Sequence, residues 1–196
     1  SNFVASQVYE FNGHYYQVVN SQSEVVQNSL TAGTYIEALD TAASMSYNGM
    51  QGNLVNITSA DENDFVSSII LADINGVTSD GYQLITDGSH IGADNDGWFY
   101  IGGSDRQDEG VYVWEAGPES GELVNYGNWM GGSPESSQKT ATGTSDDSID
   151  AIAMLGGYDY SHAHVSHGDW IVFHDGSSGD YLVSEGMRGF IVEYSP

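Results

Sequence analysis

The order of helical and extended patterns along the chain most constrains how it can fold. Capping boxes, in which Thr or Ser precedes Glu by three residues, occur at Thr34–Glu37 and Ser59–Glu62. Each of them predicts the start of a helix. From Trp98 onward the chain shows only strand and loop patterns. Two early helices followed by strands and long loops predict an α+β domain.

Local patterns predict the bounds of the other elements. Asn12-Gly13 divides residues 8–19 into two strands, because this pair favours a two-residue hairpin. The first helix is expected to continue through Met45 and to stop near Asn48-Gly49. Strands are expected at 52–57, 98–102, 111–114, 151–155, 170–173 and 190–194, and irregular insertions at 76–97 and 131–148. Because no linker or repeat divides the chain, residues 1–196 are expected to form a single domain, excised from a larger protein.

The charge balance limits the partners that the chain can bind. It carries 28 Asp and Glu residues against 3 Lys and Arg, a formal net charge of -25. Such a surface repels nucleic-acid phosphates and anionic lipids, so neither is an expected partner. The same excess suits hard divalent cations such as Ca²⁺, which take oxygen ligands. Solubility alone, as in salt-adapted proteins, is the alternative interpretation of the acidity.

Several classes of protein are disfavoured by what the sequence lacks. It has no cysteine, which excludes disulfides, thiolate metal sites and a cysteine nucleophile. No apolar run is long enough to cross a bilayer, so direct membrane insertion is not expected. The sequence motifs of nucleotide-binding loops, serine hydrolases and zinc proteases do not occur. The chain is therefore not expected to be an enzyme.

An ordered series of short motifs carries the most specific information. The series comprises Tyr35-Ile36-Glu37-Ala38, residues 54–63 (LVNITSADEN), residues 98–103 (WFYIGG), Tyr126-Gly127-Asn128-Trp129, Gly168-Asp169-Trp170 and residues 189–193 (GFIVE). Together they resemble the C-type lectin-like domain, in its cysteine-free bacterial form found in large RTX-type surface adhesins. The resemblance implies two helices flanking small antiparallel sheets, with a long irregular loop region. It also implies an extracellular, secreted location.

The resemblance also implies two kinds of calcium site. The sugar-chelating loop of the family corresponds to Ser133-Pro134-Glu135, where Ser133 has lost the first ligand and Glu135 keeps an oxygen donor. The ligand pair after the family tryptophan corresponds to Ile171 and Val172, whose side chains cannot ligate. Direct chelation of a sugar by calcium is therefore in doubt at this loop. Asp175, beyond the strand, is a candidate substitute.

A second family ion site matches better. It is implied at Asp105, Glu109 and Asp150, with Asp146 and Asp147 adding charge nearby. Carboxylates of this kind, with carbonyls and water, form the oxygen set that Ca²⁺ takes. The alternative is that 105–109 is a solvated turn and that 146–147 belongs to a loop without an ion.

Ligand contacts are expected near the same loops. The candidate contacts are Glu135, Tyr158, Tyr160, His164 and Asp169, because exposed aromatic and polar side chains bind sugars and peptides. His164 belongs to a group with His162 and His167, for which a transition-metal site and simple solvent exposure are alternatives. Trp98, Trp114, Trp129 and Trp170 are expected to be structural.

The sequence thus predicts a calcium-dependent, carbohydrate-binding lectin module of a bacterial surface adhesin, mediating attachment to cells or surfaces. Its expected cofactor is Ca²⁺, and its expected partner is a glycan on a host or neighbouring cell. The alternative is a calcium-stabilised module that binds a protein or peptide without calcium–sugar chelation.

Overall fold

A computed structural model describes residues 3–21, 34–76, 97–134, 150–156, 168–173 and 187–196. Its strands are β1 (Phe3–Ala5), β2 (Tyr9–Phe11), β3 (His14–Ser21), β4 (Ser46–Tyr47), β5 (Met50–Leu54), β6 (Gly97–Ser104), β7 (Val113–Trp114), β8 (Ala151–Gly156), β9 (Trp170–Phe173) and β10 (Met187–Tyr194). Its helices are α1 (Tyr35–Ser44), α2 (Ala60–Gly76) and the short 3₁₀ helix η1 (Met130–Gly132).

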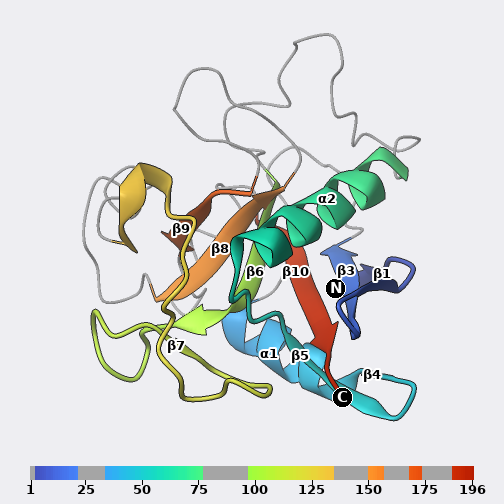
Figure 1. The fold of residues 1–196 in the computed structure, drawn as a ribbon, viewed down its shortest axis with the longest axis horizontal. Coiled ribbons are helices and arrows are strands. Elements are labelled where there is room, and N and C mark those ends of the chain that lie inside the picture. Colours follow the sequence, from blue (N-terminus) through green and yellow to red (C-terminus); the bar gives the residue numbers. More distant parts are fainter. Residues whose placement is uncertain (1–2, 22–33, 77–96, 135–149, 157–167, 174–186) are drawn as a thin grey trace, which may run out of the picture.

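The strands form one mixed sheet around β10. Its main path runs β1-β3-β10-β6-β8-β9, with β2 paired to β3, β5 to β10 and β7 to β6 (Figure 1). The last strand, β10, lies between β3 and β6, antiparallel to β3 and parallel to β6. The expected α+β class is confirmed. The pairs between these strands are antiparallel as expected, apart from the parallel pair of β10 with β6.

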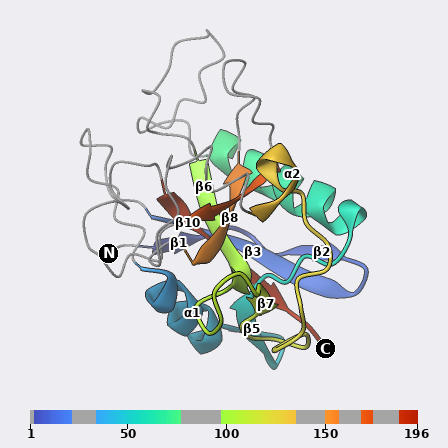
Figure 2. The same ribbon diagram turned by 90° about the vertical axis from the view of Figure 1, so that its left-hand side faces the viewer.

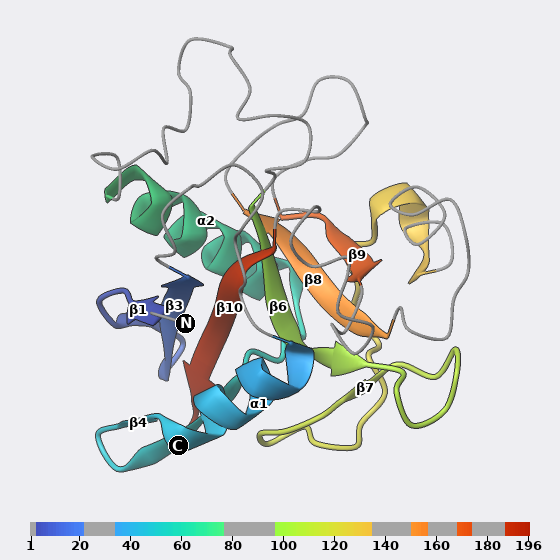
Figure 3. The ribbon, with the colours of Figure 1, turned by 180° about the vertical axis from the view of Figure 1, so that it is seen from behind.

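The two helices cover opposite faces of this sheet. Figure 1 shows α2 in front of it, and the view from behind in Figure 3 shows α1 on the other face. Side chains alternate between the faces along β10, because successive residues of a strand point to opposite sides. Phe190, Val192 and Tyr194 join the core under α1, whereas Ile191 joins the core under α2. The sheet thus has an apolar core on each face, one covered by α1 and the other by α2.

The first helix begins where its capping box predicts. Thr34 Oγ1 accepts from the Glu37 backbone N–H at 3.2 Å, and the Glu37 carboxylate accepts from Thr34 N–H at 2.9 Å. The helix ends at Ser44, earlier than expected. Asn48-Gly49 does not end the helix but forms the turn between β4 and β5, with both residues at positive φ (49° and 79°). This is the hairpin geometry that Asn-Gly favours, and Asn12-Gly13 adopts it between β2 and β3 as predicted.

The second capping motif anchors α2 to the sheet. Ser59 Oγ accepts from the Glu62 backbone N–H at 3.2 Å. The Glu62 carboxylate accepts from Thr58 N–H and from the Tyr16 hydroxyl, both at 2.8 Å. Burial raises the pKa of Glu62, and these hydrogen bonds partly offset the effect. The α2 start is therefore tied to β3 by a buried carboxylate as well as by apolar packing.

Asn63 on α2 holds β9 through the indole of Trp170. Asn63 Oδ1 accepts from Trp170 Nε1 at 2.7 Å, and Asn63 Nδ2 donates to the Gly168 carbonyl at 3.2 Å. Trp170 is fully buried, so its indole N–H cannot turn to water. Figure 2 shows α2 and α1 on opposite sides of the central strands β6, β8 and β10.

We expect Asn63→Ala to lower the free energy of unfolding by about 1–3 kcal/mol, because it leaves the Trp170 indole N–H buried without an acceptor. Equilibrium unfolding in urea measures the change. The exposed neighbour Asp64 provides the control, and Asp64→Ala is expected to stay within about 0.5 kcal/mol of wild type. Equal stabilities for the two variants would contradict the assigned role of Asn63.

Candidate metal centre

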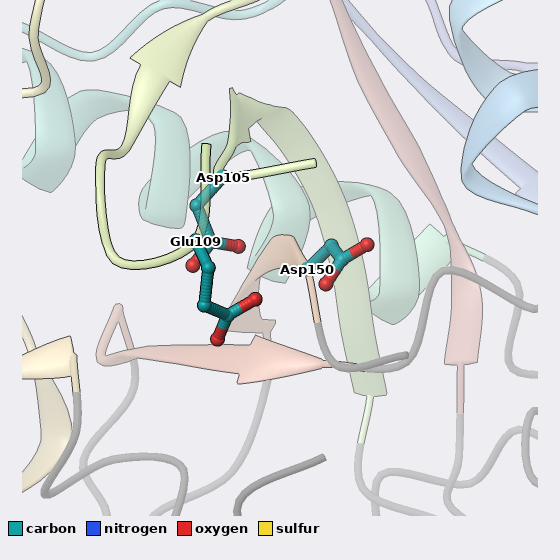
Figure 4. Close-up of side chains that lie close together, drawn as sticks. All are labelled: Asp105, Glu109 and Asp150. Carbon is teal, nitrogen blue, oxygen red and sulfur yellow. The ribbon is translucent and has the colours of Figure 1, made fainter. Parts of the chain in front are cut away.

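Three carboxylates from two separate segments of the chain meet at the junction of β6 and β8. Asp105 follows the end of β6, Glu109 lies in the turn after it, and Asp150 directly precedes β8. One oxygen from each of the three lies within 4.8 Å of the others. Figure 4 shows the side chains converging from these segments. The predicted second ion site is thus brought together as a group.

Strand pairing and one turn build this geometry. Ser104 pairs with Ala151 across β6 and β8, and Asp105 N–H donates to the Asp150 carbonyl at 3.1 Å. The turn closes where Gly110 N–H donates to Asp105 Oδ2 at 2.9 Å. Gly110 has a φ of +81°, a conformation that favours glycine. Gly110, directly after Glu109 in the sequence, therefore helps to shape the group although it has no side chain that could ligate an ion.

Asp105 is a buried carboxyl group with one oxygen left without a hydrogen bond. The residue is only 2% exposed, and Oδ1 of its side chain has no hydrogen-bond partner. Burial raises the pKa of Asp105, while hydrogen bonds from the Gly110 backbone and the Tyr112 side chain oppose the shift. Glu109 is exposed and Asp150 is at least partly buried. A cation at this point would compensate the charge on Asp105 Oδ1.

The group fits Ca²⁺ better than a transition metal. Ca²⁺ binds oxygen ligands at about 2.3–2.6 Å, so ligands on opposite sides of one ion lie about 4.6–5.2 Å apart. One oxygen from each of the three carboxylates lies within 4.8 Å of the others, so a single ion of this kind could contact all three. None of the three is a His or Cys, the ligands that zinc and copper sites favour. Asp105, Glu109 and Asp150 would hold the ion, with carbonyls or water completing its shell.

The structure places the remaining predicted residues differently. Asp169 lies outside this carboxylate group and accepts through Oδ1 from Asn128 Nδ2 at 3.3 Å. Ile171 and Val172 are buried in β9, which agrees with the inference that they cannot ligate. Seven predicted site residues lie outside the described residues: Glu135, Tyr158, Tyr160, His164, Asp146, Asp147 and Asp175.

The tryptophans are largely structural, as expected. Trp98, Trp114 and Trp170 are buried, and Trp129 is partly buried. The Trp114, Tyr126 and Trp129 rings meet Trp170 edge-on, with centroid distances of 6.2, 5.6 and 5.5 Å. This aromatic group fixes the segment before η1 against β9 and leaves little of Trp170 for a ligand.

Comparison with solved structures identifies the architecture. CEL-I, a C-type lectin from Cucumaria echinata, superimposes with a TM-score of 0.53 over 96% of this chain and 94% of that protein, at 18% identity. The mouse scavenger receptor C-type lectin carbohydrate-recognition domain gives a TM-score of 0.52 over 96% of each chain, at 16% identity. The chain has a C-type lectin fold. At these identities the likeness establishes the fold alone.

Sequence comparison adds one relative. Halomucin of Haloquadratum walsbyi is 30% identical over 139 residues, which make up 66% of this chain. The chain spans 1% of the length of halomucin, so the match concerns a small part of that protein. No family model matches the chain.

We expect calcium to stabilise the wild-type protein and not Asp105→Asn. At a calcium concentration about 100 times the Kd, binding adds about 2.7 kcal/mol, which corresponds to a rise in Tm of about 5–10 °C for a chain of this size. Thermal unfolding with calcium and with EDTA measures the rise. Asp108→Asn, at an exposed position in the same turn, is expected to retain it. A full rise in Asp105→Asn would contradict the site.

The raised pKa of Asp105 predicts how two quantities depend on pH: the stability of the calcium-free protein and the affinity for calcium. Without calcium, a raised pKa in the folded state stabilises the fold at low pH, and this contribution is lost as the pH rises through that pKa. With calcium the ion competes with the proton, so calcium affinity is expected to fall as the pH drops from 7. Calorimetric titrations over a pH series measure the affinity. In EDTA, lowering the pH is expected to increase the Tm less in Asp105→Asn than in wild type. Because Glu62, whose pKa is also raised, is present in both proteins, the difference reports on Asp105 alone.

Proposed function

We propose that the chain is an extracellular, calcium-dependent glycan-binding module of a bacterial surface adhesin. The observation that carries this proposal is the buried Oδ1 of Asp105, which has no hydrogen-bond partner and lies in a group of three carboxylates. The C-type lectin fold supports the ligand class, since CEL-I and the scavenger receptor domain are named as a lectin and a carbohydrate-recognition domain. Attachment to a glycan-bearing cell or surface would be its role.

Calcium would act first on the loops. Held by Asp105, Glu109 and Asp150, it would join the turn after β6 to the start of β8 and remove the cost of the buried carboxylate. Residues 135–149 enter β8 through Asp150, so ion binding would fix the point where this segment ends. We propose that Glu135, Asp146, Asp147 and Asp175 add oxygen donors, and that Tyr158, Tyr160, His164 and Asp169 contact the ligand.

Ile171 and Val172 favour a second candidate function. Both side chains are buried in β9, at the place where calcium–sugar chelation requires oxygen donors. A calcium-stabilised module that binds a protein or peptide requires no such chelation. The same ion site would serve both functions, so the ligand class decides between them.

The proposal also includes the location of the module and the kind of protein to which it belongs. We infer a secreted, non-enzymatic module in which residues 1–196 act as one unit of a longer, RTX-type adhesin. The absence of cysteine supports calcium as the stabilising element in place of disulfides. Within the described part of the chain, no helix has the length and apolar character needed to cross a membrane.

A glycan array probed with calcium and with EDTA tests the proposed function. Sugar binding that is lost in EDTA and in Asp105→Asn, and kept in Asp108→Asn, is the expected result. A blank array with a protein that still gains Tm in calcium would favour the protein-binding alternative. Binding that is indifferent to EDTA would contradict calcium dependence.

A further inference from the structure

A small hairpin beside the metal centre leaves an apolar face uncovered. Residues 111–114, which contain β7, pair with residues 121–124 through Val113 and Leu123. Trp114 N–H donates to the Glu122 carbonyl at 3.0 Å, and Val124 N–H donates to the Tyr112 carbonyl at 2.9 Å. The hairpin lies at the periphery of the molecule, at the lower left of Figure 1.

The two faces of this hairpin differ in burial. Tyr112, Trp114 and Val124 belong to the core under α2. Alternation along the strands places Val111, Val113 and Leu123 on the opposite face. Val111 is 39% exposed and Leu123 is 55% exposed, and Ile36 is the third large exposed apolar side chain of the described residues. We name Val111, Val113 and Leu123 the aliphatic strip.

In the outer strand of the hairpin, the backbone of Leu123 has no hydrogen-bond partner within the described part of the chain. Val113 and Leu123 form a pair without mutual hydrogen bonds, since the bonds run between their neighbours. In such a pair the backbone N–H and C=O groups point away from the partner strand. Among the described residues, none forms a hydrogen bond with the Leu123 backbone. An extended segment could therefore pair with Leu123 while its side chains lie along the aliphatic strip.

Charge and side-chain type decide which partner fits. Residues 107–125 contain Asp108, Glu109, Glu115, Glu119 and Glu122 and no Lys or Arg. The carboxylate of Glu115 lies 3.8 Å from Nε of Arg106, just before this region. The net charge of -25 opposes pairing with a second copy of the chain. Aliphatic side chains also lack the aromatic faces that stack on sugars.

We propose that the aliphatic strip and the Leu123 edge bind an extended protein segment that alternates aliphatic and basic residues. The segment adds a strand beyond residues 121–125. Its aliphatic side chains cover Val111, Val113 and Leu123, and its basic side chains face the surrounding carboxylates. None of Val111, Val113 and Leu123 is a proposed glycan contact or ion ligand, so this surface can bind a protein while the ion site serves its own role.

Synthetic peptides test the proposal by calorimetric titration with calcium present. The probe is a valine–lysine alternating peptide, compared with a serine–lysine peptide of equal charge and with the probe N-methylated at alternate residues. We expect the probe to bind at least about tenfold more tightly than either comparison peptide. Equal binding of the valine and serine peptides would show that charge alone drives the interaction, and it would overturn the proposal. Undiminished binding of the N-methylated probe would overturn it as well, because it would show that backbone pairing is not needed.

Matched variants locate the binding surface. Leu123→Asp is expected to weaken probe binding about tenfold, although it adds a negative charge that favours a cationic peptide. Ile36→Asp, on α1 and with a similar 42% exposure, is expected to bind the probe as wild type does. Thermal unfolding of both variants checks that they fold. Equal affinities for folded Leu123→Asp and Ile36→Asp would overturn the assignment to the aliphatic strip.

Discussion

The insertion of β10 into the middle of the sheet is the constraint on which the rest of the structure depends. This strand pairs with β3 from the start of the chain, with β5 after the first helix and with β6 beyond it. Its two faces supply side chains to both apolar cores. Neither core is complete until the last residues have joined the first ones. Long-range pairing of this kind makes folding cooperative and slow compared with helical proteins.

The acidic composition has a specific structural consequence at the junction of β6 and β8, where one of the carboxylates is buried. Most carboxylates of a chain with a net charge of -25 can remain in water, where they cost little. Asp105 cannot, because strand pairing with the Asp150 segment places it inside. The fold therefore brings three carboxylates together and buries Asp105 among them, and the desolvation of Asp105 opposes stability. A divalent cation bound there, as proposed, would convert that opposition into a stabilising contact between two distant segments.

The hairpin of residues 111–114 and 121–124 contributes to the apolar core with one face and carries the aliphatic strip on the other, next to the carboxylate group. Its inner face completes the aromatic core around Trp170, and its outer face carries the aliphatic strip. Gly110 joins this hairpin to the turn that contains Asp105 and Glu109. The carboxylate group and the strip thus occupy adjoining parts of one loop system, with different chemistry.

Local patterns in the sequence determined the class of fold and most of its elements. The capping boxes at Thr34 and Ser59 and the turn at Asn12-Gly13 act within a few residues, so the sequence was enough to place them. The end of α1 and the turn at Asn48-Gly49 were misread, because a helix stop and a hairpin have the same signature there. The resemblance to C-type lectins implied an ion site at Asp105, Glu109 and Asp150. Only the tertiary structure decided that β10 pairs in parallel with β6, that Asp105 Oδ1 is buried without a partner, and that Leu123 is exposed. These features depend on which distant strands pair, and no local pattern contains that information.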